Sequence, residues 1–319
     1  MKKRYRTYSD FLVERYGERV YKLPVKLPVT CPNRDGTAGR GGCIFCGEEG
    51  GGFESLNASI SVKEQLARNK EYIGRKYHVR KFIAYFQNYT NTYMPKAEFE
   101  RALKEACIDE VVGICVSTRP DCINHDYLSV FSETVKANGM DGYIELGLQT
   151  VNYHTLNKIN RGHGLAEFID AVGLSKEYGL NVCAHIILNL PWDDMDDTIE
   201  CARVLSALKV DQVKLHALYI MKGTELGRMY EEDAIKMISR DEYIERVITF
   251  LEYLDPTIIL QRLIGRAPED NSLFVNWGTS WWKIRDEIEA RMELRDTWQG
   301  IRFDYLNGRC LNKFKEADR

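Results

Sequence analysis

Strand-like and helix-like segments alternate along the first 220 residues, and this alternation limits the possible folds more than any other feature. Six segments are rich in β-branched and aromatic residues, and helical patterns lie between them. Successive βα units of about 30 residues imply a parallel sheet with right-handed crossovers. A closed eight-unit barrel, a partial barrel and an open sheet all remain compatible with the pattern. The six strand candidates are 20–29, 81–86, 111–117, 143–150, 181–190 and 212–220.

Beyond about residue 222 the alternation becomes less regular. Ser61 and Glu64 predict a capped helix start within the regular part, and Ser239 and Glu242 predict another beyond it. A further strand is predicted at 257–265. We therefore expect three parts, which are a basic N-terminal segment at 1–19, a barrel at 20–222 and a C-terminal extension at 223–319.

A glycine-rich stretch from Cys31 to Phe53 holds eight glycines and three cysteines, Cys31, Cys43 and Cys46. Cys31 directly follows the first strand candidate. The loop is therefore expected at the carboxyl end of the sheet, where parallel α/β folds bind their ligands. Glycine also permits positive φ and close backbone approach, which a loop wrapped around a bound group needs.

Three cysteines without a fourth leave two kinds of metal site open. Structural zinc takes four ligands, and the next cysteine or histidine after the loop is His78 or Cys107. A zinc site would therefore need a distant fourth ligand, or a water molecule in a catalytic site. Three thiolates can instead hold a [4Fe–4S] cluster and leave one iron open. An open metal position at the end of a βα sheet indicates catalysis.

Composition excludes several classes of protein. The chain is 44% hydrophobic and 29% charged, which is typical of a globular fold. No apolar run approaches the roughly 20 residues that span a bilayer, and no secretory signal follows the basic start. Nine cysteines, an odd number, disfavour a disulfide framework, so we expect a cytoplasmic protein with reduced thiols. The net charge of −3 gives no overall attraction to nucleic acid.

Several motifs in a fixed order carry a family resemblance. They are TCPNRDGTAGRGGCIFC, YFQNYTNTY, STRPDC, LGLQT, INRGHG and VKLHALYIMKGTEL. The chain resembles radical SAM enzymes of the uncharacterised YhcC/YtqA type, which are relatives of the catalytic subunit of Elongator. The 11-residue gap between Cys31 and Cys43 departs from the superfamily's common CxxxCxxC and matches the longer gap of this branch.

This resemblance implies an α/β fold, a partial (βα)6 TIM-like barrel with a C-terminal α/β extension. Cys31, Cys43 and Cys46 would bind a [4Fe–4S] cluster, and S-adenosyl-L-methionine (SAM) would occupy the fourth iron. The reduced cluster would cleave SAM to a 5′-deoxyadenosyl radical, which abstracts a hydrogen atom from the substrate. Such an enzyme is oxygen-sensitive and needs an electron donor such as flavodoxin or ferredoxin.

The resemblance also implies cofactor-binding residues. Phe45 corresponds to an aromatic or apolar position beside the adenine, and His185 to a position near the ribose. Gln87 and Asn91 lie where the superfamily binds the methionine amine, although they could equally cap a strand end. Arg161 resembles the residue that pairs with the methionine carboxylate, a role that suits a bidentate arginine.

Strand periodicity adds further candidates for the same site. Glu145 and Gln149 share one face of their strand, and Gln149 resembles a ribose-contacting residue. Ser117 and Arg119 end the third strand. A charged arginine is hard to bury without a partner, which favours a contact with cofactor or substrate.

Three residues are candidates for the chemical step. Lys214 and His216 alternate with apolar residues and are expected to face the barrel, although a strand histidine is more often a hydrogen-bonded core residue. Cys122 follows STRPD at the active end and could act as a radical quencher or thiol partner. An inert thiol is the alternative.

The relation to Elongator suggests tRNA as the substrate, with modification of the C5 substituent of wobble uridine 34. Two basic stretches, 1–30 and 68–81, could grip phosphates, and aromatic residues near the site could stack an unpaired base. Their alternatives are solvated helix faces and ordinary core packing. A radical SAM enzyme acting on a small metabolite or a peptide is a second hypothesis. A non-catalytic zinc or iron–sulfur scaffold is a third.

Overall fold

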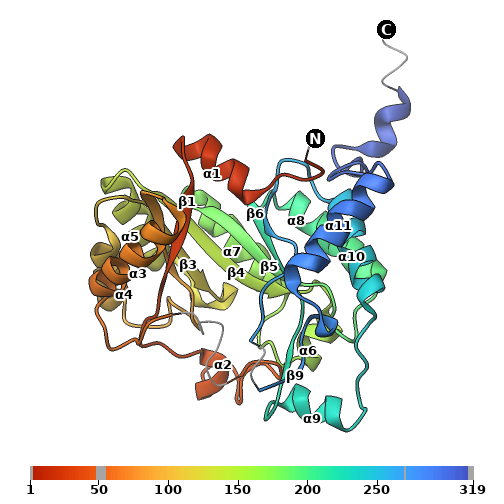
Figure 1. Cartoon of the computed structure of the whole chain (residues 1–319), viewed down its shortest axis with the longest axis horizontal. Coiled ribbons are helices and arrows are strands. Elements are labelled where there is room, and N and C mark those ends of the chain that lie inside the picture. The colour runs from red at the N-terminus through yellow and green to blue at the C-terminus, as the bar shows by residue number, and fades with distance from the viewer. Residues whose placement is uncertain (1–2, 48–54, 269–270, 315–319) are drawn as a thin grey trace.

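The computed structural model describes residues 3–47, 55–268 and 271–314. A parallel seven-stranded sheet, in the order β1-β2-β3-β4-β5-β6-β8, curls into a half-barrel at its centre (Figure 1). The predicted partial barrel is therefore confirmed. The strands are β1 (Val20–Val25), β2 (Lys81–Phe86), β3 (Val111–Thr118), β4 (Asp141–Gln149), β5 (Asn181–Ile187), β6 (Gln212–His216) and β8 (Ile259–Arg262).

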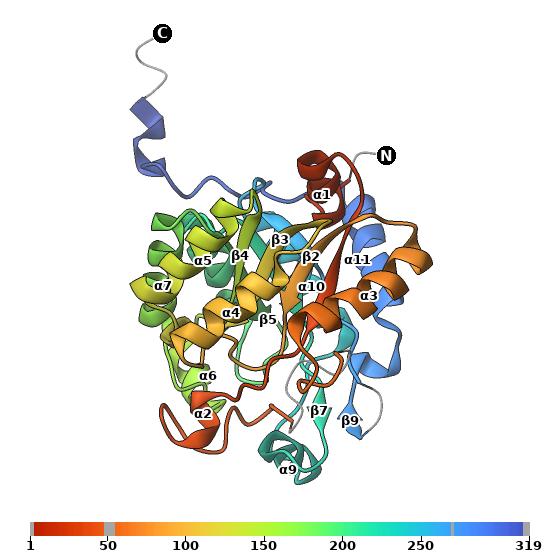
Figure 2. The same cartoon turned by 90° about the vertical axis from the view of Figure 1, so that its left-hand side faces the viewer.

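Helices cover the outer face of the curled sheet, as the two perpendicular views show (Figures 1 and 2). The apolar residues between these helices and the strands form the largest core cluster of the described residues. Ser61 caps α3 and Ser239 caps α10 as predicted, because each hydroxyl accepts from the amide three residues later. The covering helices are α3 (Val62–Tyr77), α4 (Lys96–Ala106), α5 (His125–Ala137), α7 (Leu165–Glu177), α8 (Met195–Ala207) and α10 (Arg240–Tyr253).

The sheet has one more strand than the six predicted for the barrel. The strand expected at 257–265 is present as β8, and it pairs in parallel with β6. The barrel sheet thus continues into the region expected as the C-terminal extension. β8 meets the N-terminal segment at its other edge, where the amide of Leu260 donates to the carbonyl of Arg6 at 2.9 Å.

Four strands are shorter than predicted, since β5 ends at Ile187 instead of residue 190, β8 is shorter than 257–265, and β1 and β6 also end early. β1 ends at Val25 because side chains replace the ladder, with the Lys26 amide donating to Gln65 and the Leu27 amide to Asn88. The segment predicted at 212–220 divides into β6 and a separate two-residue strand, β7 (Ile220–Met221). β7 pairs antiparallel with β9 (Ser272–Phe274) outside the main sheet.

The inner face of the half-barrel changes character from one end to the other. Helix α1 (Tyr8–Tyr16) packs its Leu12 against Val20, Ile83 and Tyr143, which closes the amino end with apolar contacts. Figures 1 and 2 both place α1 at the end opposite α2 (Pro32–Asp35). Polar side chains are thus concentrated towards the carboxyl ends of the strands.

The remaining elements are short or lie in the C-terminal part. Within the described residues no helix is long and apolar enough to span a membrane. These elements are α6 (Tyr153–Lys158), α9 (Glu225–Glu231), α11 (Trp281–Leu294) and the 3-10 turns Pro120–Cys122, Asn276–Gly278 and Arg309–Phe314.

Candidate active site

A cavity of about 490 Å³ opens at the carboxyl ends of the strands, a volume typical of small-molecule sites. It draws residues from the cysteine loop and from all seven strands of the sheet or the segments just after them. Thirteen of the fifteen residues singled out from the sequence line it. They are Cys31, Cys43, Phe45, Cys46, Gln87, Ser117, Arg119, Glu145, Gln149, Arg161, His185, Lys214 and His216.

The cysteine loop is shaped by its backbone. Cys31 begins α2, a single helical turn that ends at Gly36 with φ of 98°, a left-handed conformation that favours glycine. Gly42 has φ of 80°, and a Cβ there would lie 3.1 Å from the Arg34 side chain. The Cys46 amide then donates to the Cys43 carbonyl at 2.9 Å, which closes a tight turn. This local geometry brings all three cysteines to the cavity.

Nitrogen donors surround two of the three sulfurs. Arg34 donates to Cys46 Sγ at 3.4 Å, Asn33 donates to Cys43 Sγ at 3.7 Å and Arg161 donates to Cys43 Sγ at 3.6 Å. Cationic and amide donors of this kind stabilise thiolates and metal-bound sulfur. Burial raises the pKa of the Cys46 thiol, and Arg34 opposes that rise.

Two observations decide whether zinc or an iron–sulfur cluster fits the three cysteines. They are the distances between the sulfurs and a hydrogen-bond donor of Arg161. Among the described residues, Cys31, Cys43 and Cys46 do not form a trio with ligand atoms within 4.8 Å of one another. Zinc–sulfur bonds of about 2.3 Å need a tighter group, whereas a four-iron cluster spreads its ligands. The buried Nε of Arg161 has no hydrogen-bond partner in the described part of the chain, which leaves it available to an acceptor. The residues therefore fit an iron–sulfur cluster with a polar ligand beside it.

Glu145 is the centre of a buried charge cluster deeper in the half-barrel. Lys22 donates to its Oε1 at 2.6 Å. Its Oε2 accepts from Tyr85 at 2.7 Å, Lys214 at 3.0 Å and Ser117 at 3.1 Å. Lys214 also donates to the Tyr85 hydroxyl at 2.7 Å. Lys22 and Tyr85 come from β1 and β2, so six strands, β1 to β6, supply this cluster once His185 is included.

Burial and the attraction between opposite charges act against each other in setting the protonation of the residues in this cluster. Burial alone would raise the pKa of Glu145, but Lys214 and Lys22 hold it well below its usual range. Burial lowers the pKa of Lys214 to about 8, against the attraction of Glu145. Burial also lowers the pKa of His185 to about 4, so this imidazole is neutral near pH 7. Lys214 thus has its proton-transfer range close to physiological pH.

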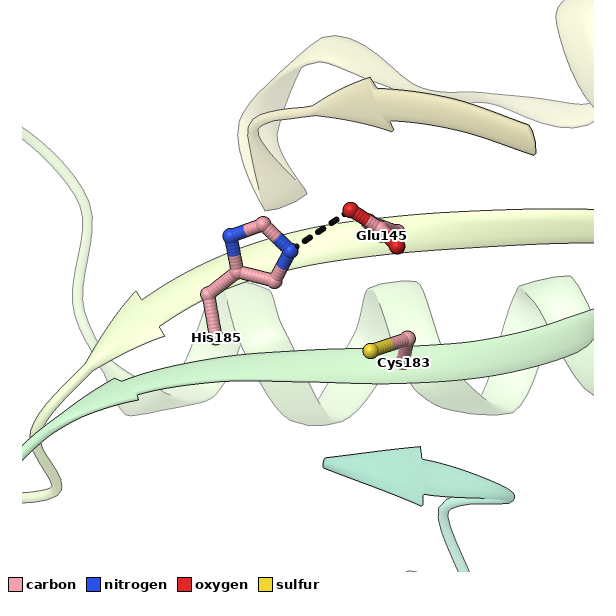
Figure 3. A group of neighbouring side chains, drawn as sticks. All are labelled: Glu145, Cys183 and His185. Carbon is pink, nitrogen blue, oxygen red and sulfur yellow. Dashed lines mark hydrogen bonds and ion pairs between the residues drawn. The ribbon is translucent and has the colours of Figure 1, made fainter. Parts of the chain in front are cut away.

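Glu145, Cys183 and His185 lie close enough together to hold a metal ion (Figure 3). The His185 Nε2 to Glu145 Oε2 distance is 2.8 Å, and the two residues project from the neighbouring strands β4 and β5. Two lysines already neutralise Glu145, and burial raises the pKa of the Cys183 thiol well above its usual range. A cation would meet repulsion and a protonated thiol here, so the trio is part of the charge cluster and not a metal centre.

Two predicted residues lie outside the cavity. Asn91 is fully buried, and its Nδ2 donates to the carbonyls of Phe86 at 3.1 Å and Ser117 at 2.8 Å, so it links β2 to β3. Cys122 lines a separate surface depression near Tyr93 and Tyr127. Asn91 therefore does not line the cavity, whereas the Cys122 thiol lies close enough to Cys31 for their charges to interact, although it opens into a different depression.

Arg119 reaches the cavity, but the reason given for it from the sequence does not hold. It forms a bidentate pair with Asp121 at 2.8 and 2.6 Å, and it donates to the Arg161 carbonyl at 2.9 Å. The arginine is therefore buried with a partner of its own.

Gln149 has φ of 80°, unusual for a residue other than glycine, and this directs its strand end towards Arg161 and Gly147.

A curled parallel sheet with three loop cysteines at its carboxyl end defines a class of iron–sulfur enzyme, and comparison with known families agrees. The chain belongs to the radical SAM superfamily, whose family model matches residues 31–205, and a Radical_SAM C-terminal domain matches residues 210–294. It is 35% identical to the uncharacterized protein YtqA of Bacillus subtilis (strain 168), over 95% of this chain and 94% of YtqA. The predicted membership of the YhcC/YtqA-type branch is thereby confirmed.

The chain is also similar, at lower identity, to a protein named for an enzymatic activity and to a solved structure. The chain is 27% identical to a tRNA uridine(34) acetyltransferase of Methanocaldococcus jannaschii, over 53% of this chain and 31% of that protein. The solved structure of Methanocaldococcus infernus Elp3, with an N-terminal deletion, matches with a TM-score of 0.68 at 17% identity. The match covers 88% of this chain and 64% of that one, and at this identity it shows the fold alone.

Proposed function

We propose that this enzyme binds a [4Fe–4S] cluster through Cys31, Cys43 and Cys46 and uses SAM to modify the C5 substituent of a tRNA wobble uridine. The observation that carries the proposal is that the three cysteines share one cavity with the buried Glu145 cluster. A cluster held by these cysteines would supply the reducing electron for the cleavage of SAM. The residues of the chain orient the cofactors and transfer protons.

On the cysteine side, the residues orient the cofactors. Arg161 donates to Cys43 Sγ through Nη1 and to the Gly147 carbonyl through Nη2, which fixes the guanidinium. Its unpartnered Nε is suited to the methionine carboxylate of SAM. Phe45 offers an apolar surface for the adenine, and Gln149 offers an amide for the ribose. Gln87 is the remaining candidate for the methionine amine, since it lines the cavity and Asn91 does not.

On the inner side, the charge cluster holds and moves protons. Lys214 donates to both Glu145 and the Tyr85 hydroxyl, and Tyr85 in turn donates to Glu145. With a pKa of about 8, Lys214 can give a proton to a substrate intermediate or accept one near neutral pH. We assign Lys214 the role of general acid or base, with Tyr85 and Glu145 orienting it.

The tRNA substrate rests on two lines of support. One is the similarity to the named tRNA uridine(34) acetyltransferase. The other is a wider opening of about 1190 Å³ that adjoins the cysteines and is lined by Arg34, Arg40, Lys222 and Arg266. Basic side chains around an opening suit a phosphate backbone. A uridine would have to leave its base stack to reach the cavity, which a tRNA loop permits.

Two experiments test the proposal in turn. The protein is reconstituted anaerobically with iron and sulfide, reduced in the presence of SAM, and assayed for 5′-deoxyadenosine. A coloured iron–sulfur protein that releases 5′-deoxyadenosine is expected, whereas a colourless protein with one zinc ion would contradict the cluster. The second experiment compares the modified nucleosides in tRNA from a deletion strain and its parent. An unchanged profile would remove tRNA as substrate and favour a small metabolite or a peptide.

A further inference from the structure

Arg262 is a charged residue of the cavity that the proposed reaction does not use. It ends β8, the last strand of the sheet, and lines both the cysteine cavity and a second cavity beside α1. Its Nε donates to the Leu215 carbonyl at 3.2 Å, and its Nη2 lies 2.6 Å from His216 Nδ1. No Asp or Glu of the described residues lies within ion-pair distance of the guanidinium, and none of these residues accepts from its Nη1 edge.

His216 is a neutral donor beside this arginine. The same Arg262 Nη2 lies 2.6 Å from Nδ1 and 3.3 Å from Nε2 of His216. Because arginine can only donate, we assign the closer nitrogen, Nδ1, as the acceptor and place the ring proton on Nε2. Burial and the neighbouring Arg262 lower the pKa of His216 well below its usual range, which agrees with this state. The His216 ring lies 5.0 Å from the ring of His185, so two neutral imidazoles flank the inner cavity.

The charges of the inner cavity do not balance. Lys22 and Lys214 share the single carboxylate of Glu145, and the partners of Arg262 among the described residues, Leu215 and His216, are neutral. The cavity lining here therefore carries two more positive than negative charges. Arg262 is half-buried at the end of β8, and a cation in a cavity wall without a counter-charge is stabilised when an anionic ligand binds beside it.

The glycine at position 265 leaves room for the guanidinium of Arg262. A Cβ at this position would lie 2.7 Å from Arg262 Cζ and 2.8 Å from its Nη2. Any side chain at 265 would therefore displace the end of Arg262, while the backbone around it could stay in place. The absence of a side chain thus permits the position in which Arg262 contacts His216.

We propose that Arg262 and His216 form an oxyanion-binding subsite that holds a carboxylate of the substrate. The Nη1 edge of Arg262 and the Nε2–H of His216 supply its donors, and a planar two-oxygen anion matches the guanidinium edge. This inference rests on the proposed function, in which the carboxylate belongs to the C5 substituent of the uridine. It is separate from Arg161, which contacts Cys43 on the opposite side of the site.

The test compares two nucleosides that differ in charge and hardly in shape. Isothermal titration calorimetry on the reconstituted protein with SAM measures binding of 5-carboxymethyluridine and its neutral amide, 5-carbamoylmethyluridine. The wild-type protein should prefer the carboxylate by about 10- to 100-fold, as expected for a charged hydrogen bond. Arg262→Gln and Gly265→Ala should both lose that preference. Arg285→Gln removes a similar charge that lines only the neighbouring cavity, and it should keep the preference.

A second readout separates this inference from the proposed function. Acetate and inorganic phosphate are titrated into 15N-histidine-labelled protein while the His216 resonance, assigned with His216→Gln, is recorded. If neither nucleoside binds but acetate shifts the resonance in the wild type and not in Gly265→Ala, the subsite stands and the uridine substrate fails. Equal binding of both nucleosides, unaffected by Gly265→Ala, would overturn the subsite and leave the uridine substrate standing. A shift with phosphate but none with acetate would overturn its assignment to a carboxylate.

Discussion

The cysteine side and the inner side of the cavity are built in different ways. Cys43 and Cys46 lie on a loop whose course depends on left-handed glycines, and their sulfurs meet cations at 3.4 to 3.6 Å. Glu145 on β4 and Lys214 on β6, with β5 between the two strands, are fully or almost fully buried and lie 3.0 Å apart. A loop can adapt to a large inorganic group, whereas strands hold small polar groups in fixed positions.

This difference indicates that the loop binds the cofactor and that the strand cluster controls protonation. The loop supplies soft sulfur ligands and depends on a bound group to bring them together. The strand cluster is complete in the protein alone, since Glu145 has five donors in the described residues. Mutations on the loop should therefore affect cofactor content, and mutations in the cluster should affect folding stability and protonation.

The largest effect should come from the loop. Cys43→Ala removes one of three cluster ligands, so iron content after anaerobic reconstitution should fall from about four atoms per chain to near background. Folding stability measured without cofactors should hardly change. Cys310→Ala removes an exposed thiol and is the matched control. Normal iron content in Cys43→Ala would mean that the cluster is held elsewhere.

The next largest effect should come from the centre of the strand cluster. Glu145→Gln keeps the shape but leaves Lys22 and Lys214 without their counter-charge, so the free energy of unfolding should fall by about 3 to 5 kcal/mol. Urea denaturation of the cofactor-free protein measures this. Glu64→Gln breaks a solvent-exposed pair with Arg68 and should cost under about 1 kcal/mol. Similar costs for the two variants would show that the cluster is not buried as described.

A smaller effect concerns the proton on Lys214. Its pKa of about 8, against an ordinary value of 10.5, should appear in an NMR titration of 13C-labelled lysine, with the resonance assigned by Lys214→Arg. Between these pH values the unfolded chain binds the proton and the folded chain does not, so this group makes stability rise with pH. Glu145→Gln should lower the pKa further because it removes the attracting anion. An ordinary pKa in the wild type would remove Lys214 as the general acid or base.

The smallest effect should come from Cys122. This residue lies near Cys31 but lines a separate depression, so Cys122→Ser, which keeps a small polar side chain, should leave iron content and SAM cleavage unchanged and alter stability by no more than about 0.5 kcal/mol. A marked loss of 5′-deoxyadenosine would restore the role suggested by its sequence position. That result would mean that the two-sided description of the site is incomplete.

The sequence predicted the sheet and the cysteine loop because both depend on local signals. Alternating strands and helices follow from apolar periodicity, and Cys43 and Cys46 are recognised by their spacing. Strand ends were less predictable. β1 stops at Val25 because the amides of the next two residues donate to the side chains of Gln65 and Asn88. These two residues lie elsewhere in the chain, so the sequence of the strand itself does not predict where it ends.

The charge cluster was predictable only in part. Glu145 and Lys214 were found through period-2 alternation, but Lys22 and Tyr85 were not placed in the cluster, and Arg262 was not assigned to the cavity. A lysine within the apolar segment VYKLPV was a signal that could have found Lys22. Arg262 could not be found in this way, because its partner strand β6 lies more than 40 residues earlier in the chain. Contacts between strands, and not residue types, decide which polar side chains meet.

The most direct test of the central claim is Mössbauer spectroscopy of the 57Fe-reconstituted protein before and after addition of SAM. Three cysteine ligands leave one iron different from the others, so SAM should change the signal of about one iron in four. This is the expected result if Cys31, Cys43 and Cys46 hold the cluster at the opening of the cavity. Four equivalent irons that do not respond to SAM, or a protein that takes up zinc and no cluster, would contradict it.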